Sequence, residues 1–131
     1  MTLEVYQGFI DFLLTNRFAL RKIWVYKGGF TMIKHILFWR FQDAVREDPA
    51  LAQEVLQKLS DSVSHMNGQI PGLIHAEIGR NLLGGDWDFV FYSEFTDQAS
   101  LDSYQNHPLH VAHKQMAAPY LAARLAADYQ V

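Results

Sequence analysis

The sequence contains no cysteine, and this absence excludes several kinds of chemistry. Without thiols the chain forms no disulfide, holds no cysteine-ligated zinc or iron–sulfur centre and has no thiolate nucleophile. The redox state of a compartment therefore places no restriction on the protein, and a cytoplasmic location is the default expectation.

Clusters of positive charge and long hydrophobic runs are also missing. Residues 32–131 carry seven basic and twelve acidic groups, with no run of Lys or Arg. Because phosphate neutralisation dominates the affinity for nucleic acids, this composition argues against such a partner. The most hydrophobic stretch, residues 5–26, is interrupted by Asp11, Asn16, Arg17 and Arg21, so no run approaches the roughly 20 apolar residues of a spanning helix. We expect neither a nucleic acid nor a membrane as partner.

The first 31 residues differ from the rest, with four basic against two acidic groups. They do not have the basic start and small-residue end of a secretory signal. One interpretation is an amphipathic surface helix, whose apolar face would hold Val5, Phe9, Phe12, Leu13, Leu20 and Ile23. Alternatively, a purine-rich tract encoding Lys27-Gly28-Gly29 would resemble a bacterial ribosome-binding site, which makes Met32 the native start. We treat residues 1–31 as an N-terminal extension, and the intact mass of the natural product would distinguish the two interpretations.

Residues 32–131 are long enough and apolar enough for one domain with a hydrophobic core. Residues 32–41 are β-branched and aromatic on both faces, which predicts a central strand. Side chains alternate along a strand, so His35 shares the apolar face of Ile33, Leu37, Trp39 and Phe41. His35 should therefore point into a hydrophobic layer.

The remaining pattern predicts an α+β, ferredoxin-like βαββαβ domain with a four-stranded antiparallel sheet and helices on one face. Asp48-Pro49 is typical of a helix start, and Asn67-Gly68 of a helix end. After the turn Ile70-Pro71-Gly72 we expect strands at residues 73–83 and 87–95, joined by Gly84-Gly85-Asp86. Helices should follow from Thr96 or Asp97 and from Pro108 to about Ala118, before a closing strand at residues 124–131.

The sheet face opposite the helices is largely apolar in this arrangement, as Ile36 and Phe38 on the first strand illustrate. An exposed apolar face of this size marks an interface, and symmetric dimers are the commonest solution. We therefore expect a homodimer in which a second copy covers the sheet.

The segment Ser103–His113 concentrates the candidate chemistry. It holds three of the six histidines, His107, His110 and His113, together with Tyr104. Because Pro108 suits the first turn of a helix, His110 should lie in that turn, with His107 and Tyr104 at a junction between two helices. Imidazoles and a phenol at such a place can transfer protons near neutral pH.

Several structural alternatives stay open for these residues. Tyr104 and His107 can instead hold the junction together by hydrogen bonds. Three-residue steps rotate around a helix and the segment 103–113 has no Asp or Glu, so we expect no metal site. His113 and His65 are expected at the surface. His75, which alternates with Glu77, either faces the pocket or pairs across strands.

The combination of His35, the turn Ile70-Pro71-Gly72 and the motif Tyr104-x-x-His107-Pro108-x-His110 resembles the stress-responsive A/B barrel (Dabb) family of dimeric α+β barrels. The resemblance covers residues 32–131. It implies a homodimer with an internal pocket in each subunit. In a plant member that closes a polyketide chain by intramolecular aldol condensation, the position matching His110 is the general base, the one matching Tyr104 holds the substrate carbonyl, and the one matching His35 lines the pocket.

We therefore expect a dimeric barrel that binds a small, partly apolar molecule and uses no cofactor or metal. The catalytic candidates are His110, Tyr104 and His35. The candidate ligand-binding residues are His107, Trp39, Phe89, Phe91 and Leu37, although the aromatic ones can equally belong to a dimer-interface core. Two alternatives are a cofactor-independent cyclase or aldolase-like enzyme with His110 as base, and a structural stress-response dimer without a ligand.

Overall fold

The computed structural model describes residues 31–131 of the chain, and Met32–Val131 form one compact unit. The amphipathic helix expected in the N-terminal extension lies outside the described residues. Among the residues that are described, no helix is both long and apolar enough to cross a membrane.

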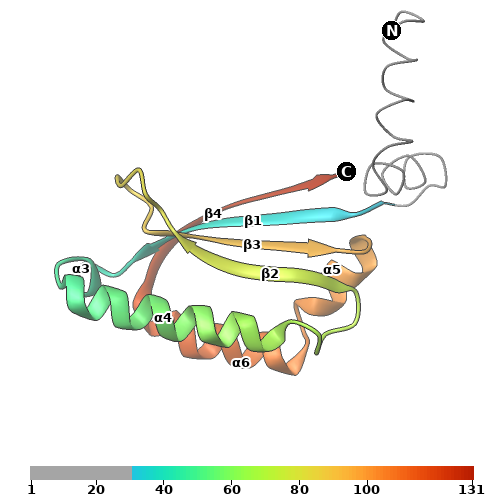
Figure 1. Cartoon of the computed structure of the whole chain (residues 1–131), viewed down its shortest axis with the longest axis horizontal. Helices are drawn as coiled ribbons and strands as arrows, with labels where there is room; N and C mark the ends of the chain where they lie inside the picture. Colours follow the sequence, from blue (N-terminus) through green and yellow to red (C-terminus); the bar gives the residue numbers. More distant parts are fainter. Residues whose placement is uncertain (1–30) are drawn as a thin grey trace, which may run out of the picture. The chain divides into compact units, whose positions relative to one another are not determined.

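The described part alternates strands and helices in the expected order (Figure 1). The elements are β1 (Ile33–Phe41), α3 (Asp43–Arg46), α4 (Pro49–Met66), β2 (Leu73–Arg80), β3 (Phe89–Phe95), α5 (Gln98–Tyr104), α6 (Pro108–Ala117), the short 3₁₀ turn η1 (Ala118–Tyr120) and β4 (Leu121–Gln130).

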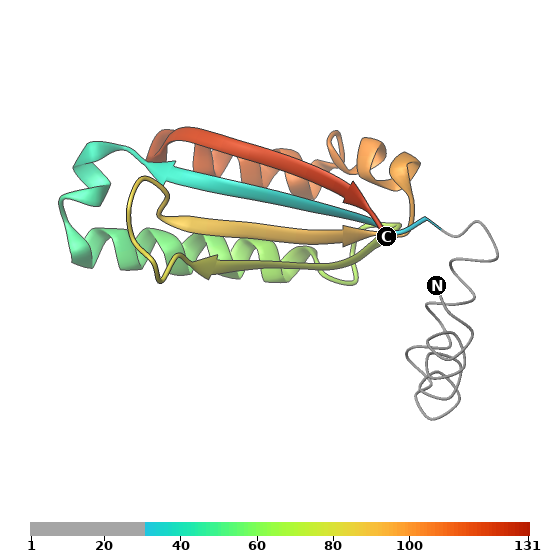
Figure 2. The ribbon, with the colours of Figure 1, turned by 90° about the horizontal axis from the view of Figure 1, so that it is seen from above.

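Four antiparallel strands form one sheet in the order β2-β3-β1-β4. The ferredoxin-like α+β arrangement and the central position of β1 are thereby confirmed. Figure 2 shows the sheet from above with the helices behind it, and Figure 1 shows the same helices under one face. The sheet therefore has an inner face against the helices and an outer face without them.

Local capping rules explain the long helix. The carboxylate of Asp48 accepts a hydrogen bond from the Leu51 backbone N–H, and Pro49 opens the helix, as expected for an N-cap followed by proline. At the other end, the Asn67 amide bonds both backbone groups of Ala76 at 2.8 Å, and Gly68 takes a positive φ. The end of α4 is therefore fixed against β2.

Element boundaries differ from the expected ones around the β2–β3 connection. β2 ends at Arg80 and β3 begins at Phe89, because the carboxylate of Asp88 turns toward Phe41 N–H and the Arg46 guanidinium. Arg46 belongs to α3, a single turn that the sequence pattern did not predict. β4 begins at Leu121, three residues earlier than expected.

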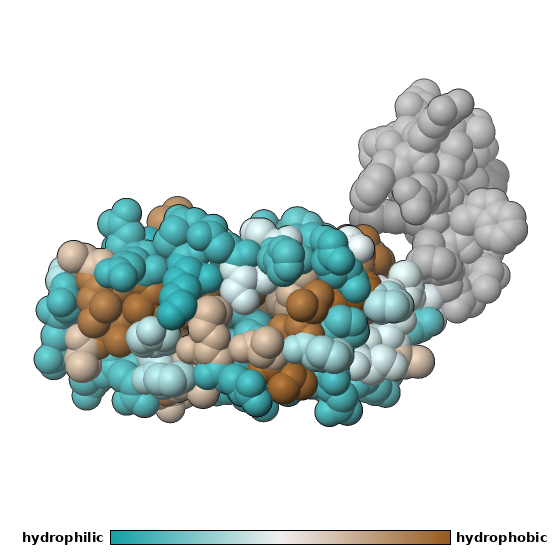
Figure 3. Space-filling view, turned by 90° about the horizontal axis from the view of Figure 1, so that it is seen from below, coloured by the Kyte–Doolittle hydropathy of each residue, from teal (hydrophilic) through white to brown (hydrophobic). Residues whose placement is uncertain are grey.

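The core lies between the inner sheet face and the helices. Fully buried side chains include Leu59 and Val63 from α4 and Phe89 and Phe95 from β3. The helix side of the molecule is mainly hydrophilic, with its hydrophobic side chains in separate areas (Figure 3). The outer sheet face, in contrast, leaves Phe38, Leu125 and Tyr129 substantially exposed.

Candidate functional site

A cavity of about 630 Å³ lies between α6 and the inner sheet face. Its apolar walls include Leu37, Trp39, Phe89 and Phe91, the four apolar side chains expected around a ligand. The other lining residues are His35, Leu59, Gln105, His110, His113, Lys114, Ala117, Ala118, Leu121, Ala122, Ala123 and Arg124. Three imidazoles thus share one largely apolar space.

His110 lies in the first turn of α6 and is buried. Its Nδ1 is 3.2 Å from the backbone carbonyl oxygen of Tyr104. A carbonyl only accepts, so Nδ1 carries the proton and the lone pair is on Nε2. Burial, with the charge of Lys114 and the ring of His113 adding to it, lowers the pKa of His110 to about 4. At neutral pH His110 is therefore a neutral imidazole with a fixed tautomer.

Tyr104 stacks against His110, with ring centroids 3.8 Å apart and planes inclined by 19°. Its ring also packs on Phe95. Burial raises the pKa of the Tyr104 phenol, so the hydroxyl stays protonated. This hydroxyl is buried and has no hydrogen-bond partner among the residues that the structure describes. Tyr104 lies behind His110 rather than on the cavity wall.

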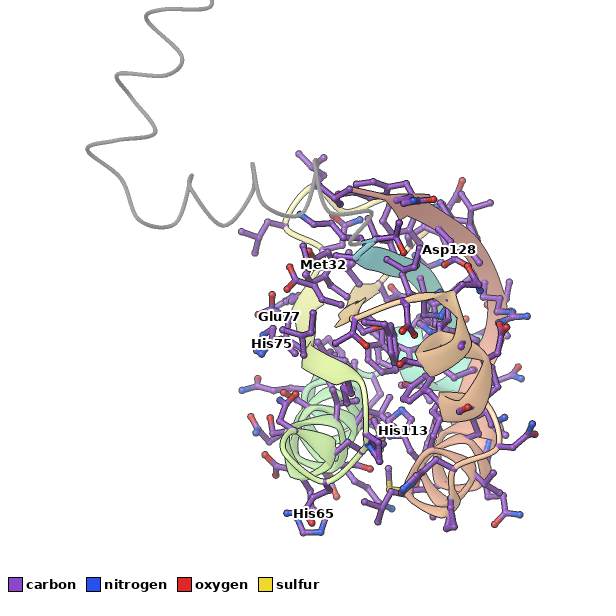
Figure 4. All side chains as sticks on the ribbon, turned by 90° about the vertical axis from the view of Figure 1, so that its right-hand side faces the viewer. Met32, His65, His75, Glu77, His113 and Asp128 are labelled. Carbon is purple, nitrogen blue, oxygen red and sulfur yellow. The ribbon has the colours of Figure 1, made fainter. Side chains whose placement is uncertain are left out.

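His35 is buried on the inner face of β1 and lines the same cavity. It pairs in register with Asp128 of β4, and its Nδ1 is hydrogen-bonded to the Asp128 carboxylate, which lies on β4 beside β1 (Figure 4). Because a carboxylate accepts, His35 Nδ1 donates and the ring orientation is fixed. Asp128 was not among the expected site residues, although alternation along residues 124–131 places it on one face with Arg124.

The prediction that His113 lies at the surface is wrong. His113 is 6% exposed, and Figure 4 shows it between α4 and α6. Its Nδ1 is 2.9 Å from Ser62 Oγ of α4, and its ring meets Phe91 edge-on. Burial lowers the pKa of His113 to about 4. The physical reason is that residues 110, 113 and 117 form one buried helix face.

The other histidines lie away from the cavity. His107 is the N-cap of α6 and accepts a hydrogen bond from Leu109 N–H at 3.2 Å, so its side chain serves the helix junction. His65 is exposed, as expected. His75 is exposed, and its Nε2 lies 3.7 Å from Oε2 of Glu77 on the same strand (Figure 4). His75 therefore does not face the pocket. Within residues 31–131 no group of three or more His, Asp or Glu could hold a metal ion.

The comparisons with known proteins agree with this fold. The model of the stress responsive A/B barrel domain (Dabb) matches residues 33–131. A dimeric protein of unknown function with a ferredoxin-like fold from Bacteroides fragilis is 27% identical, with a TM-score of 0.69 over 76% of this chain and 96% of that chain. A Dabb family protein from Mesorhizobium loti is 29% identical, with a TM-score of 0.60 over 76% and 95%.

More distant enzymes share the architecture. The hydroxynitrile lyase from Passiflora edulis has a TM-score of 0.62 over 76% of this chain and 93% of its own, at 15% identity, a likeness of fold alone. No curated protein matches the chain.

Proposed function

Because this chain belongs to the stress responsive A/B barrel domain family, we propose that it works as a homodimer that binds a small, partly apolar molecule in the cavity between α6 and the sheet. The observation that carries this proposal is the cavity itself. Its volume of about 630 Å³ falls in the range of small-molecule sites, which combine apolar walls with a few oriented polar groups.

The polar groups of the cavity support a ligand with a hydroxyl group or another hydrogen-bond donor. In both His110 and His35, Nδ1 donates a hydrogen bond to an acceptor of the protein. The second ring nitrogen of each imidazole is not sealed from solvent, because neither is among the buried unpaired polar atoms of the described residues, and it is therefore open to a ligand group in the cavity. A ligand hydroxyl or N–H group would donate a hydrogen bond to such a nitrogen, while the apolar part of the ligand would lie against Phe89 and Phe91.

Ligand binding can be tested with a neutral aromatic probe. Calorimetric titration with 1-naphthylacetamide should give saturable binding to the purified protein. Ala122→Trp, which fills the mouth of the cavity from an exposed position, should abolish it. Ala112→Trp, on the exposed side of α6, is the matched control and should bind normally. Native mass spectrometry should also detect a co-purified small molecule. A protein that binds no probe and carries no small molecule would support the structural dimer instead.

The outer sheet face supports the dimer. Phe38 pairs in register with Leu125, and the two side chains are 37% and 53% exposed. A second copy packing on this face would bury them, and the relative from Bacteroides fragilis is described as dimeric. Leu125→Glu should convert the dimer to a monomer in light scattering after size-exclusion chromatography. Leu83→Glu, at a 96% exposed position between β2 and β3, should leave the dimer intact.

Cofactor-independent acid–base catalysis is a second candidate, and the His110 tautomer favours it. His110 Nε2 would take a proton from the carbon next to a substrate carbonyl, leaving an enolate whose carbon attacks a second carbonyl. The protonated imidazole then returns the proton to the new alkoxide, so no external reagent is needed. A neutral imidazole is the required base form, and burial supplies it. This chemistry is the cyclase or aldolase type implied by the family resemblance.

Tyr104 is the candidate donor for such a reaction. Its buried hydroxyl has no protein partner within the described residues. Because Tyr104 does not line the cavity, this hydroxyl would reach a substrate oxygen through a bridging water. A fixed donor stabilises a developing oxyanion. The Asp128 carboxylate meanwhile keeps His35 oriented toward the same space.

Turnover of the co-purified molecule, or of a linear polyketide thioester, would test the catalytic candidate. His110→Gln should abolish turnover without changing the dimer, whereas His65→Gln, at an exposed position on α4, should have no effect. If His110→Gln lowers the melting temperature but leaves turnover unchanged, His110 has a structural role and the catalytic candidate is refuted.

A further inference from the structure

The two charged side chains that line the cavity are both cations. Its lining includes the cations Lys114 and Arg124 but no Asp or Glu, in a chain whose net charge is −3. Low-dielectric walls strengthen the field of such charges within a cleft. An acidic protein that presents only cations to its cavity favours an anionic ligand there.

Arg124 occupies a defined place on the cavity wall. It pairs in register with Trp39 of β1, and its guanidinium carbon is 6.0 Å from the centroid of the Trp39 ring. Arginine and tryptophan at this distance attract each other, which places the guanidinium beside the cavity. Arg46 forms a salt bridge with Asp88. Arg124, in contrast, has no carboxylate partner among residues 31–131.

A carboxylate lies next to the other end of this space. Asp128 is bound to His35, whereas Arg124 faces Trp39, four residues further along β1. Four residues of an antiparallel strand span roughly 13 Å. An anionic ligand group is therefore repelled at the His35 end and attracted at the Trp39 end, so the charges also orient the ligand.

From this polarity we infer that the ligand of the cavity is an amphipathic carboxylate. Its carboxylate binds Arg124, its apolar body lies against Trp39 and Phe89, and its uncharged end reaches His35 and His110. Guanidinium groups bind carboxylates by two parallel hydrogen bonds, so Arg124 selects the acid over its neutral analogues. The inference rests on the proposed function, because it specifies the ligand class of that same cavity.

Lys114 has a smaller part in this selection. Its Nζ donates to the backbone carbonyl of Gln105 at 2.9 Å, and Lys114 is exposed at the rim. Its ammonium group adds positive potential but does not offer two parallel hydrogen-bond donors in a fixed geometry. Removing its charge should therefore weaken carboxylate binding less than removing that of Arg124.

Two probes of nearly the same shape test the inference. Calorimetric titrations with 1-naphthylacetate and 1-naphthylacetamide compare ligands with the same ring, one carrying a charged carboxylate and the other a neutral amide. The unmodified protein should bind the acetate about tenfold more tightly than the amide, as expected for one charged hydrogen-bonded pair. Arg124→Gln should remove this preference by lowering the affinity for the acetate to that for the amide. Arg80→Gln, at an exposed position of β2 outside the cavity, is the matched control and should preserve it.

The outcomes separate this inference from the proposed function. Equal affinity for both probes would overturn the inferred selectivity for carboxylates, but the proposal that the cavity binds a ligand would remain. A preference for the acetate that survives Arg124→Gln would also overturn the inference, because the anion would then bind elsewhere. Failure of both probes to bind would refute both the proposed ligand binding in the cavity and the inference about carboxylates.

Discussion

Mild acid should destabilise this fold through two buried imidazoles. The pKa values of His110 and His113 are lowered from 6.5 to about 4, mainly by burial. In the unfolded chain both rings regain the ordinary value, so between about pH 6.5 and about pH 4 the unfolded state binds more protons than the folded state. Protonation then favours unfolding, and the free energy of unfolding falls as the pH is lowered through this window.

The size of the effect follows from the same values. The difference between 6.5 and about 4 corresponds to about 3 kcal/mol for each imidazole. The two contributions add, because the repulsion between the rings enters the shift of His110 and not that of His113. Domains of this size are stable by roughly 5–15 kcal/mol. Protonating the two rings should therefore remove a large part of the stability.

Urea unfolding followed by circular dichroism, at one protein concentration and at several values between about pH 7.5 and about pH 4.5, measures this effect. His113→Asn keeps a hydrogen-bonding atom near Ser62 but removes one titrating ring. The slope of unfolding free energy against pH should fall by up to about 1.4 kcal/mol per pH unit.

His65→Asn is the control, since His65 is an exposed position on α4, and its slope should equal that of the unmodified protein. A stability that stays constant across the pH window would refute the reasoning. So would an equal loss of slope in the His65 variant, because the linkage would then not depend on burial.

Four substitutions test the packing that positions the site, each by urea unfolding at neutral pH. Gly72 has a φ of +80°, and a Cβ there would lie 2.1 Å from Ser100 Oγ on α5, so Gly72→Ala should cost more than the roughly 1–2 kcal/mol of the left-handed conformation. Gly68→Ala, with similar φ but nothing within 4 Å, should cost only that amount, and equal losses would contradict the clash. Asp48→Ala should cost about 1 kcal/mol, because the helix loses its N-cap. Leu59→Ala should cost about 3 kcal/mol, because this fully buried side chain forms part of the cavity wall. A loss below about 1 kcal/mol would show that the wall collapses into the space.

Local signals account for the parts of the fold that were predicted correctly. The Asp48-Pro49 start and the Asn67-Gly68 end of α4 depend on capping between residues that are neighbours in the sequence. The junction before Pro108 depends on the fixed φ of proline. The side chains on the inner face of β1 follow from alternation once β1 is recognised as a strand. His35, Leu37 and Trp39 could therefore be assigned to one side of the sheet.

The errors involve choices that neighbours in sequence do not decide. His113 was expected at the surface because steps of three residues rotate the side chains around a helix. The spacing of positions 110, 113 and 117 is also that of a single helix face, and packing against α4 buries this face. The capping bond of His107 was compatible with the sequence but could not be distinguished from a contact with a ligand.

The sequence alone determined the order of strands and helices, the capped ends of α4 and the concentration of imidazoles beside Pro108, because each depends on residues a few positions apart. Only the tertiary structure decided that Asp128 binds His35 and that Arg124 faces Trp39. These partners are 93 and 85 positions apart, and the register between β1 and β4 pairs them. Since a shift of one residue in that register would turn every side chain of β4 to the opposite face, the composition of the cavity is a property of the assembled sheet.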